Sequence, residues 1–177
     1  PAIARKQISI ESVADLVAKT RTAELPNVVF VDSREFISSY ELIQRSHLVM
    51  VYNSTIGLEA TLLGKPVLAG GKARFTQLST AYYPVSNREY KTLLEKFLAQ
   101  DEVPVPNEFV HNARRFLYYQ LYATSLEFGD FLEEDGIWKG YVKPKDFDLD
   151  ELTPERSPTV KVLLEGILSG GDFCYPL

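Results

Sequence analysis

The sequence predicts an α/β fold in which a parallel sheet with flanking helices is followed by a helical C-terminal extension. Short apolar, β-branched runs alternate with helical patterns in the first 70 residues, which is typical of parallel strands joined by crossovers. From residue 107 onward, amphipathic helical patterns prevail. We therefore expect a domain over residues 1–106 and an extension over residues 107–177 that packs on it, the two forming one structural domain.

The first elements are a helix, a strand and a second helix. A helical pattern opens at Ile8, with Ser9 or Ser12 as the capping residue, and ends near residues 20–24. Val28–Val31 is predicted to be a short buried strand with Asp32 at its carboxyl end. Ser38 and Ser39 are expected to cap the next helix.

The stretch from residue 49 to 71 organises the rest of the chain. Val49–Tyr52 is a continuous apolar run, the pattern of a strand buried on both faces. Asn53–Thr55 then offers three capping residue types before a helix, which Gly64 is suited to end. Pro66 leads into a second strand, Val67–Ala69. The unit is a βαβ crossover, and ligands of open α/β sheets bind at the carboxyl end of such strands.

Three further segments complete the prediction. Asn87 is expected to cap a helix through Gln100, and a long helix is expected from Asn107 to Glu133. Residues 143–155 are rich in proline and aspartate and are predicted to be a loop. The final helix, Thr159–Leu168, is stopped by the glycine pair that follows it.

The polar turn after the central strand suits an anion with a sugar attached. The first amides of a helix have no internal partner, so phosphate binds there readily, and Ser54 and Thr55 add hydroxyl donors. Glu59, one turn into the helix, can accept hydrogen bonds from two ribose hydroxyls. The alternative is structural: Ser54 or Thr55 caps the helix while Glu59 complements the helix dipole. The spacing alone leaves both interpretations open.

Two cations follow the second strand. Gly70 and Gly71 let the backbone approach a ligand, and Lys72 and Arg74 can neutralise a diphosphate or a sugar carboxylate. The alternative is a flexible surface loop with solvated cations. For Asp32, the alternative to a ligand-facing role is a turn residue that caps its own loop.

The motif NSTIGLEATLLGKPV at residues 53–67, preceded by SSYELI at residues 38–43, resembles the capsule polysaccharide biosynthesis family. The similarity covers roughly residues 26–90. The family contains glycosyltransferases of the GT-B type, with two Rossmann-like domains facing a cleft. Their C-terminal domain binds the nucleotide-sugar donor in a site that includes this motif.

The resemblance implies a Rossmann-like, nucleotide-sugar-binding domain over residues 1–106. It places Ser54, Thr55 and Lys72 at the donor phosphates and Glu59 at the ribose. The candidate base or sugar contacts are Asp32, Ser39, Tyr40 and Arg74.

The resemblance also implies the partners: a CMP- or UDP-linked sugar donor and a growing polysaccharide acceptor. No cofactor and no tightly held metal are expected, and the expected location is cytoplasmic, peripheral at the inner membrane. In such enzymes the N-terminal domain supplies the base, and the C-terminal half begins with a strand carrying a His-Pro pair that this sequence lacks. Since the chain also opens at Pro1, we expect that an N-terminal half is missing and that this chain alone is inactive.

Two other functions stay open. One is an epimerase-like enzyme acting on a UDP-N-acetylhexosamine, which would share the fold and the phosphate site. The other is a non-catalytic sugar-binding domain of a polysaccharide assembly complex.

Composition excludes several classes of protein. The net charge of −5 argues against nonspecific nucleic-acid binding, which needs a basic surface. The single cysteine, Cys174, excludes an internal disulfide framework. No apolar run reaches the roughly 20 residues that a membrane-spanning helix needs.

Overall fold

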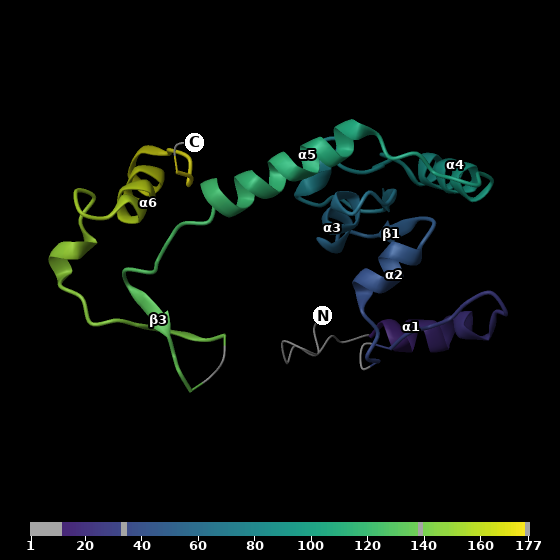
Figure 1. The fold of residues 1–177 in the computed structure, drawn as a ribbon, viewed down its shortest axis with the longest axis horizontal. Coiled ribbons are helices and arrows are strands. Elements are labelled where there is room, and N and C mark those ends of the chain that lie inside the picture. Colours follow the sequence, from purple (N-terminus) through teal and green to yellow (C-terminus); the bar gives the residue numbers. More distant parts are fainter. Residues whose placement is uncertain (1–11, 33–34, 138–139, 176–177) are drawn as a thin grey trace. The chain divides into compact units, whose positions relative to one another are not determined.

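The computed structural model describes residues 12–32, 35–137 and 140–175 (Figure 1). The chain divides into two compact units, Pro1–Arg45 and Ser46–Leu177. The expected boundary at residue 106 stays a prediction.

The first unit contains the helices α1 (Val13–Thr20), η1 (Thr22–Glu24, 3-10) and α2 (Ser39–Arg45). Ser12 caps α1 in a capping box: its hydroxyl accepts a hydrogen bond from the Asp15 amide, and the Asp15 carboxylate accepts one from the Ser12 amide. The Ser12 hydroxyl also donates to the Asp15 carboxylate at 2.6 Å, and this bond, together with the one from the Ser12 amide, holds the pKa of Asp15 below its usual value. The cap predicted at Ser12 is thus confirmed, while the alternative, Ser9, lies outside the described residues.

The predicted strand over residues 28–31 is wrong. These residues adopt no regular structure, and Val29 is 87% exposed. A strand needs backbone partners on a neighbouring strand, and none in the described part of the chain pairs with this segment. Asp32 therefore follows an irregular segment rather than a strand end.

The second unit begins with the predicted strand, helix and strand, which the structure confirms. β1 (Val49–Val51) and β2 (Val67–Ala69) are parallel, with Met50 opposite Leu68, and α3 (Ile56–Leu62) connects them. Gly64 ends this connection with a φ of 74°. Tyr82 continues the sheet beyond β2 through an isolated parallel bridge to Leu68.

β2, rather than β1, is the buried strand. Val67, Leu68 and Ala69 are at most 1% exposed, whereas Met50 on β1 is 50% exposed. The expected burial of residues 49–52 on both faces is wrong: Val49 and Val51 on one face are half-buried, whereas Met50 and Tyr52 on the other face are exposed. α3 packs on both strands, and Phe75, in the 3-10 helix η2 (Phe75–Gln77), completes this core at 1% exposure.

Two longer helices follow. α4 (Asn87–Leu98) is capped by Ser86, whose hydroxyl accepts a hydrogen bond from the Glu89 amide, so the predicted cap at Asn87 is off by one residue. α5 (Asn107–Tyr118) packs against α3 and continues into a π-helical turn, η3 (Tyr119–Ala123).

The helix predicted from Asn107 to Glu133 ends ten residues early. The hydroxyls of Thr124 and Ser125 both donate to the Gln120 carbonyl, which gives the backbone an alternative to a further helical turn. Farther on, β3 (Leu132–Glu134) pairs antiparallel with β4 (Val142–Pro144), so the extension is not wholly helical.

The chain closes with the 3-10 helix η4 (Leu149–Leu152) and α6 (Pro158–Ser169), which ends at Gly170 with a φ of 69°. The last helix is therefore confirmed. Tyr175 ties the C-terminal segment back: its amide donates to the Ala123 carbonyl, and its hydroxyl accepts from the Glu127 amide. The architecture is mixed α/β with a small parallel sheet, and no described helix is long and apolar enough to cross a membrane.

Candidate functional site

A hollow of about 700 Å³ opens beside the carboxyl ends of β1 and β2. One wall is the end of β1 with Tyr52 and Gly70, and the other is the loop and first turn leading into α4. Parallel sheets bind ligands at this edge, because the strand ends there leave backbone groups and loops free to contact a ligand. The described residues that line it are Met50, Val51, Tyr52, Gly70, Tyr83, Pro84, Val85, Ser86, Asn87 and Tyr90.

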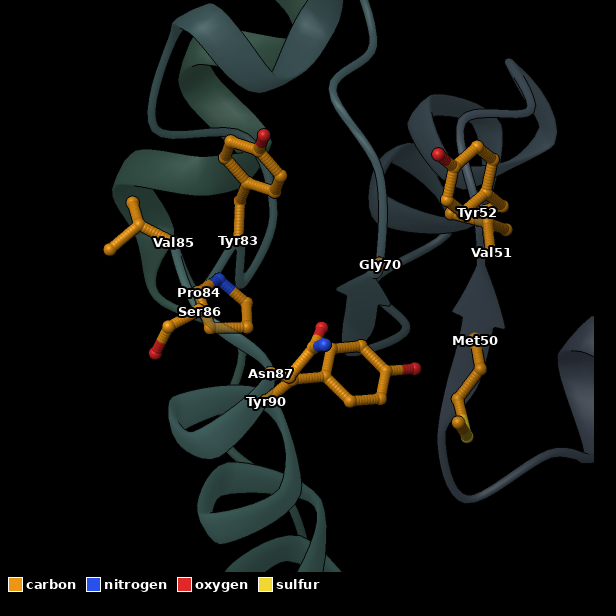
Figure 2. Close-up of a pocket in the computed structure, with 10 residues that line it drawn as sticks. All are labelled: Met50, Val51, Tyr52, Gly70, Tyr83, Pro84, Val85, Ser86, Asn87 and Tyr90. Carbon is orange, nitrogen blue, oxygen red and sulfur yellow. The ribbon is translucent and has the colours of Figure 1, made fainter.

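Three tyrosines are the aromatic residues among the described lining of the hollow (Figure 2). Tyr90 projects from the first turn of α4 into the space in front of β1, while Tyr83 comes from the preceding loop and Tyr52 from the end of β1. Tyr52 is 74% exposed, and the other two are half-buried. An aromatic ring offers a flat apolar face together with a hydroxyl, which suits a nucleobase or a sugar ring.

Gly70 and Gly71 make room for two of these rings. A Cβ on Gly71 would lie 2.8 Å from the Tyr52 ring, and one on Gly70 would lie 3.4 Å from the Tyr90 ring. The amides of Gly70 and Gly71 donate to the carbonyls of Val51 and Tyr52 at 2.8 and 2.7 Å. At Gly71, therefore, the protein's own tyrosine occupies the space that we expected to admit a ligand.

The start of α4 forms the polar rim of the hollow. The Ser86 hydroxyl accepts from the Glu89 amide at 3.2 Å, and the Glu89 carboxylate accepts from the Val85 amide at 3.1 Å. These two bonds hold Val85 and Ser86 against the first turn of α4. The Asn87 side chain is exposed at the rim.

The polar turn predicted to bind phosphate follows a lining residue of this hollow, Tyr52, in the sequence. Ser54 and Thr55 follow Tyr52 and are exposed. Thr55 is the N-cap residue of α3, yet its side chain makes no capping hydrogen bond; the turn is closed by its own carbonyl and that of Ser54, which accept from the amides of Leu58 and Gly57. The structural interpretation of Thr55 as a side-chain cap is therefore wrong. Glu59 is half-buried on α3 and does not line the hollow.

Lys72 and Arg74 follow the two glycines, and both are exposed. The Gly71–Tyr52 hydrogen bond holds the segment beside the end of β1, so Lys72 follows directly after the paired residues. Arg74 precedes η2 and lines a different groove, described below.

The remaining candidates belong to the first unit. Asp32 is half-buried, and its carbonyl accepts from the Glu35 amide. Ser39 is the first residue of α2, and Tyr40 is 50% exposed. These three residues lie in the first unit, whereas the residues that line the hollow lie in the second unit.

Sequence reasoning missed Tyr83, Asn87 and Tyr90 as site residues. The sequence predicts a loop at Tyr83, which lies beside a proline, but a tyrosine in a loop does not by itself indicate a binding site. Its convergence with Tyr52, however, depends on the pairing of Tyr82 with Leu68, which no local pattern reveals.

The tyrosine rings of the hollow suit a nucleobase or a sugar ring. The described residues that line it include no carboxylate, imidazole or amine side chain that could move a proton. Among the described residues, no group of three or more His, Cys, Asp or Glu side chains could hold a metal ion.

Residues 9–82 match the family model described as capsule polysaccharide biosynthesis protein. This match supports the resemblance to that family. It covers less than half of the 177 residues, includes α3 and both strands of the parallel sheet, and suggests a role in capsule synthesis. No curated protein and no solved structure matches the chain.

Proposed function

We propose that this chain is the donor-binding half of a glycosyltransferase for capsule or surface polysaccharide synthesis, built on a Rossmann-like domain of the GT-B type. The observation that carries the proposal is the tyrosine-lined hollow at the carboxyl edge of β1 and β2, within and next to the segment that matches the capsule family model.

The donor would lie across the strand ends. The rings of Tyr83 and Tyr90 offer faces for the base of a CMP- or UDP-linked sugar, a contact worth roughly 1–3 kcal/mol per stacked base. The exposed Ser54 and Thr55 hydroxyls, together with Lys72, would bind the phosphates, and Glu59 would bind the ribose hydroxyls. Asp32, Ser39 and Tyr40 remain proposed base or sugar contacts.

A second candidate is favoured by the absence of an acid or base from the described lining of the hollow. That feature fits a sugar-binding domain that transfers nothing and serves a polysaccharide assembly complex. The two candidate functions differ in whether sugar is transferred to an acceptor. In the glycosyltransferase, a base supplied by a neighbouring domain would act on an acceptor held against the donor with water excluded.

The phosphate contacts can be tested by a double substitution. Ser54→Ala with Thr55→Val should weaken binding of the nucleotide diphosphate or monophosphate by about 1–3 kcal/mol in calorimetry, because hydrogen bonds to a charged group are lost. Ser169→Ala, at the exposed end of α6, is the control and should bind like the unmodified chain.

Thermal unfolding checks that the double variant is folded. Unchanged nucleotide affinity in a folded double variant would contradict the phosphate assignment. Sugar transfer by the 177-residue chain alone, above the hydrolysis background, would contradict the expectation that it binds the donor without acting on it.

A further inference from the structure

A second concave surface runs along α5, formed by two adjoining hollows of about 710 and 540 Å³. The two hollows share Leu78, Phe116 and Tyr119. We call the whole the arginine groove. Its described lining residues are Arg74, Gln77, Leu78, His111, Asn112, Arg114, Arg115, Phe116, Tyr118, Tyr119, Gln120 and Thr124.

Positive charge is concentrated in the arginine groove. Arg114 and Arg115 come from α5 and Arg74 from the segment after β2, and all three are exposed. Within the described part of the chain, no ion pair ties these three guanidinium groups to a carboxylate. The chain as a whole has a net charge of −5, so the groove carries positive charge on a protein that is negative overall.

Acidic groups lie at the edges of the groove rather than in its lining. Glu108 lines a neighbouring hollow together with His111 and Arg114. Cys174 and, more weakly, Asp172 raise the pKa of the Tyr119 hydroxyl. No aspartate or glutamate is among the described residues that line the groove itself.

The lining of the groove also includes exposed apolar and aromatic side chains. Tyr118 and Tyr119 are 57% and 43% exposed, and Leu78 is 46% exposed. The Tyr118 ring also lies 4.9 Å from that of Tyr122, one turn farther along. Rings held open to solvent in this way offer apolar faces to the C–H side of a sugar ring.

We propose that the arginine groove binds an acidic oligosaccharide chain, with guanidinium groups on its carboxylates or phosphates and tyrosine rings against its sugars. Arginine suits this role because its planar fork binds carboxylate and phosphate with two parallel hydrogen bonds. The surface is concave, which fits a chain rather than a flat lipid surface. The biological sense of this inference rests on the proposed function, in which such a chain is the acceptor or product.

The test uses the full chain and needs no nucleotide, so it can fail or succeed independently of donor binding. The probe is a hexamer of galacturonate, with uncharged maltohexaose and phosphatidylglycerol vesicles as comparison ligands. Binding is measured by calorimetry at low and at physiological salt. Arg114→Gln with Arg115→Gln removes two charges from the groove. Arg156→Gln with Lys161→Gln removes two from exposed positions elsewhere and is the matched control.

We expect the unmodified chain and the control to bind the galacturonate hexamer in a salt-sensitive manner. The groove variant should bind at least about tenfold more weakly, the loss expected for one charge-assisted contact. Tyr118→Leu, which keeps an apolar side chain without the ring, should also weaken binding.

Four results would overturn the proposal. They are no binding by the unmodified chain, equal loss in the control and the groove variant, equal affinity for maltohexaose, and binding to the vesicles but not to the hexamer.

Discussion

At the scale of single residues, the tyrosines of the hollow depend on the glycines opposite them. Gly71 is buried under the Tyr52 ring, and Gly70 lies against the Tyr90 ring. Gly71 has no positive φ, so alanine is tolerated there by the backbone and the side-chain space decides the outcome.

Gly71→Ala should therefore affect the hollow more than the fold. The new Cβ would lie 2.8 Å from a ring that is 74% exposed, and this ring can turn away into solvent at little cost. We expect the free energy of unfolding to change by less than about 1 kcal/mol, as at an ordinary surface site. Nucleotide binding should weaken about fivefold, equivalent to about 1 kcal/mol, because one wall of the hollow moves.

Gly129→Ala is the control for both measurements, since its nearest atom, Glu127 Oε1, would be 3.7 Å from the new Cβ. A sharp loss of stability in Gly71→Ala with undiminished nucleotide binding would show that Tyr52 supports the fold and not the site.

At the scale of elements, the close packing of α3 on the sheet depends on Gly57. A Cβ there would lie 2.9 Å from Val51 Cγ2 and 3.1 Å from Phe75 Cζ. Gly57 and Phe75 are buried and Val51 is half-buried, so the Phe75 ring cannot move into solvent to make room.

Gly57→Ala therefore sets two effects against each other. Alanine in the interior of a helix gains up to about 1 kcal/mol over glycine. Overpacking a core costs typically about 1–3 kcal/mol. Because both contacts are closer than van der Waals distance and the Phe75 ring is buried, we expect net destabilisation of up to about 2 kcal/mol, measured by urea unfolding. A more stable Gly57→Ala variant would contradict the packing of α3 described above.

Local patterns predicted those elements that local interactions determine. The β1–α3–β2 unit was predicted because its capping residues, glycine stop and proline lie within the unit itself. The strand expected over residues 28–31 failed because strand formation depends on a partner far away in the sequence. The long helix from Asn107 was correct at its start and wrong at its end, where Thr124 and Ser125 compete for a helix carbonyl.

At the scale of the whole molecule, only part of the site could be predicted from the sequence. The turn at Ser54 and Thr55 could be found, since it follows an apolar run directly. Tyr83 and Tyr90 could not, because they reach the same edge of the sheet only through the bridge at Tyr82 and the cap at Ser86. The convergence of Tyr52 with Tyr83 and Tyr90, which are distant in the sequence, is a property of the folded chain.

The proposed function depends on nucleotide binding in the hollow at the carboxyl edge of β1 and β2. An amide chemical-shift titration with CMP and with UDP tests it most directly, because it reports where on the chain the ligand binds. We expect that one of the two nucleotides shifts the amides of Tyr52, Gly70, Tyr83, Asn87 and Tyr90, while those of α6 stay unchanged. No shift at millimolar nucleotide, or shifts confined to residues outside this hollow, would contradict it.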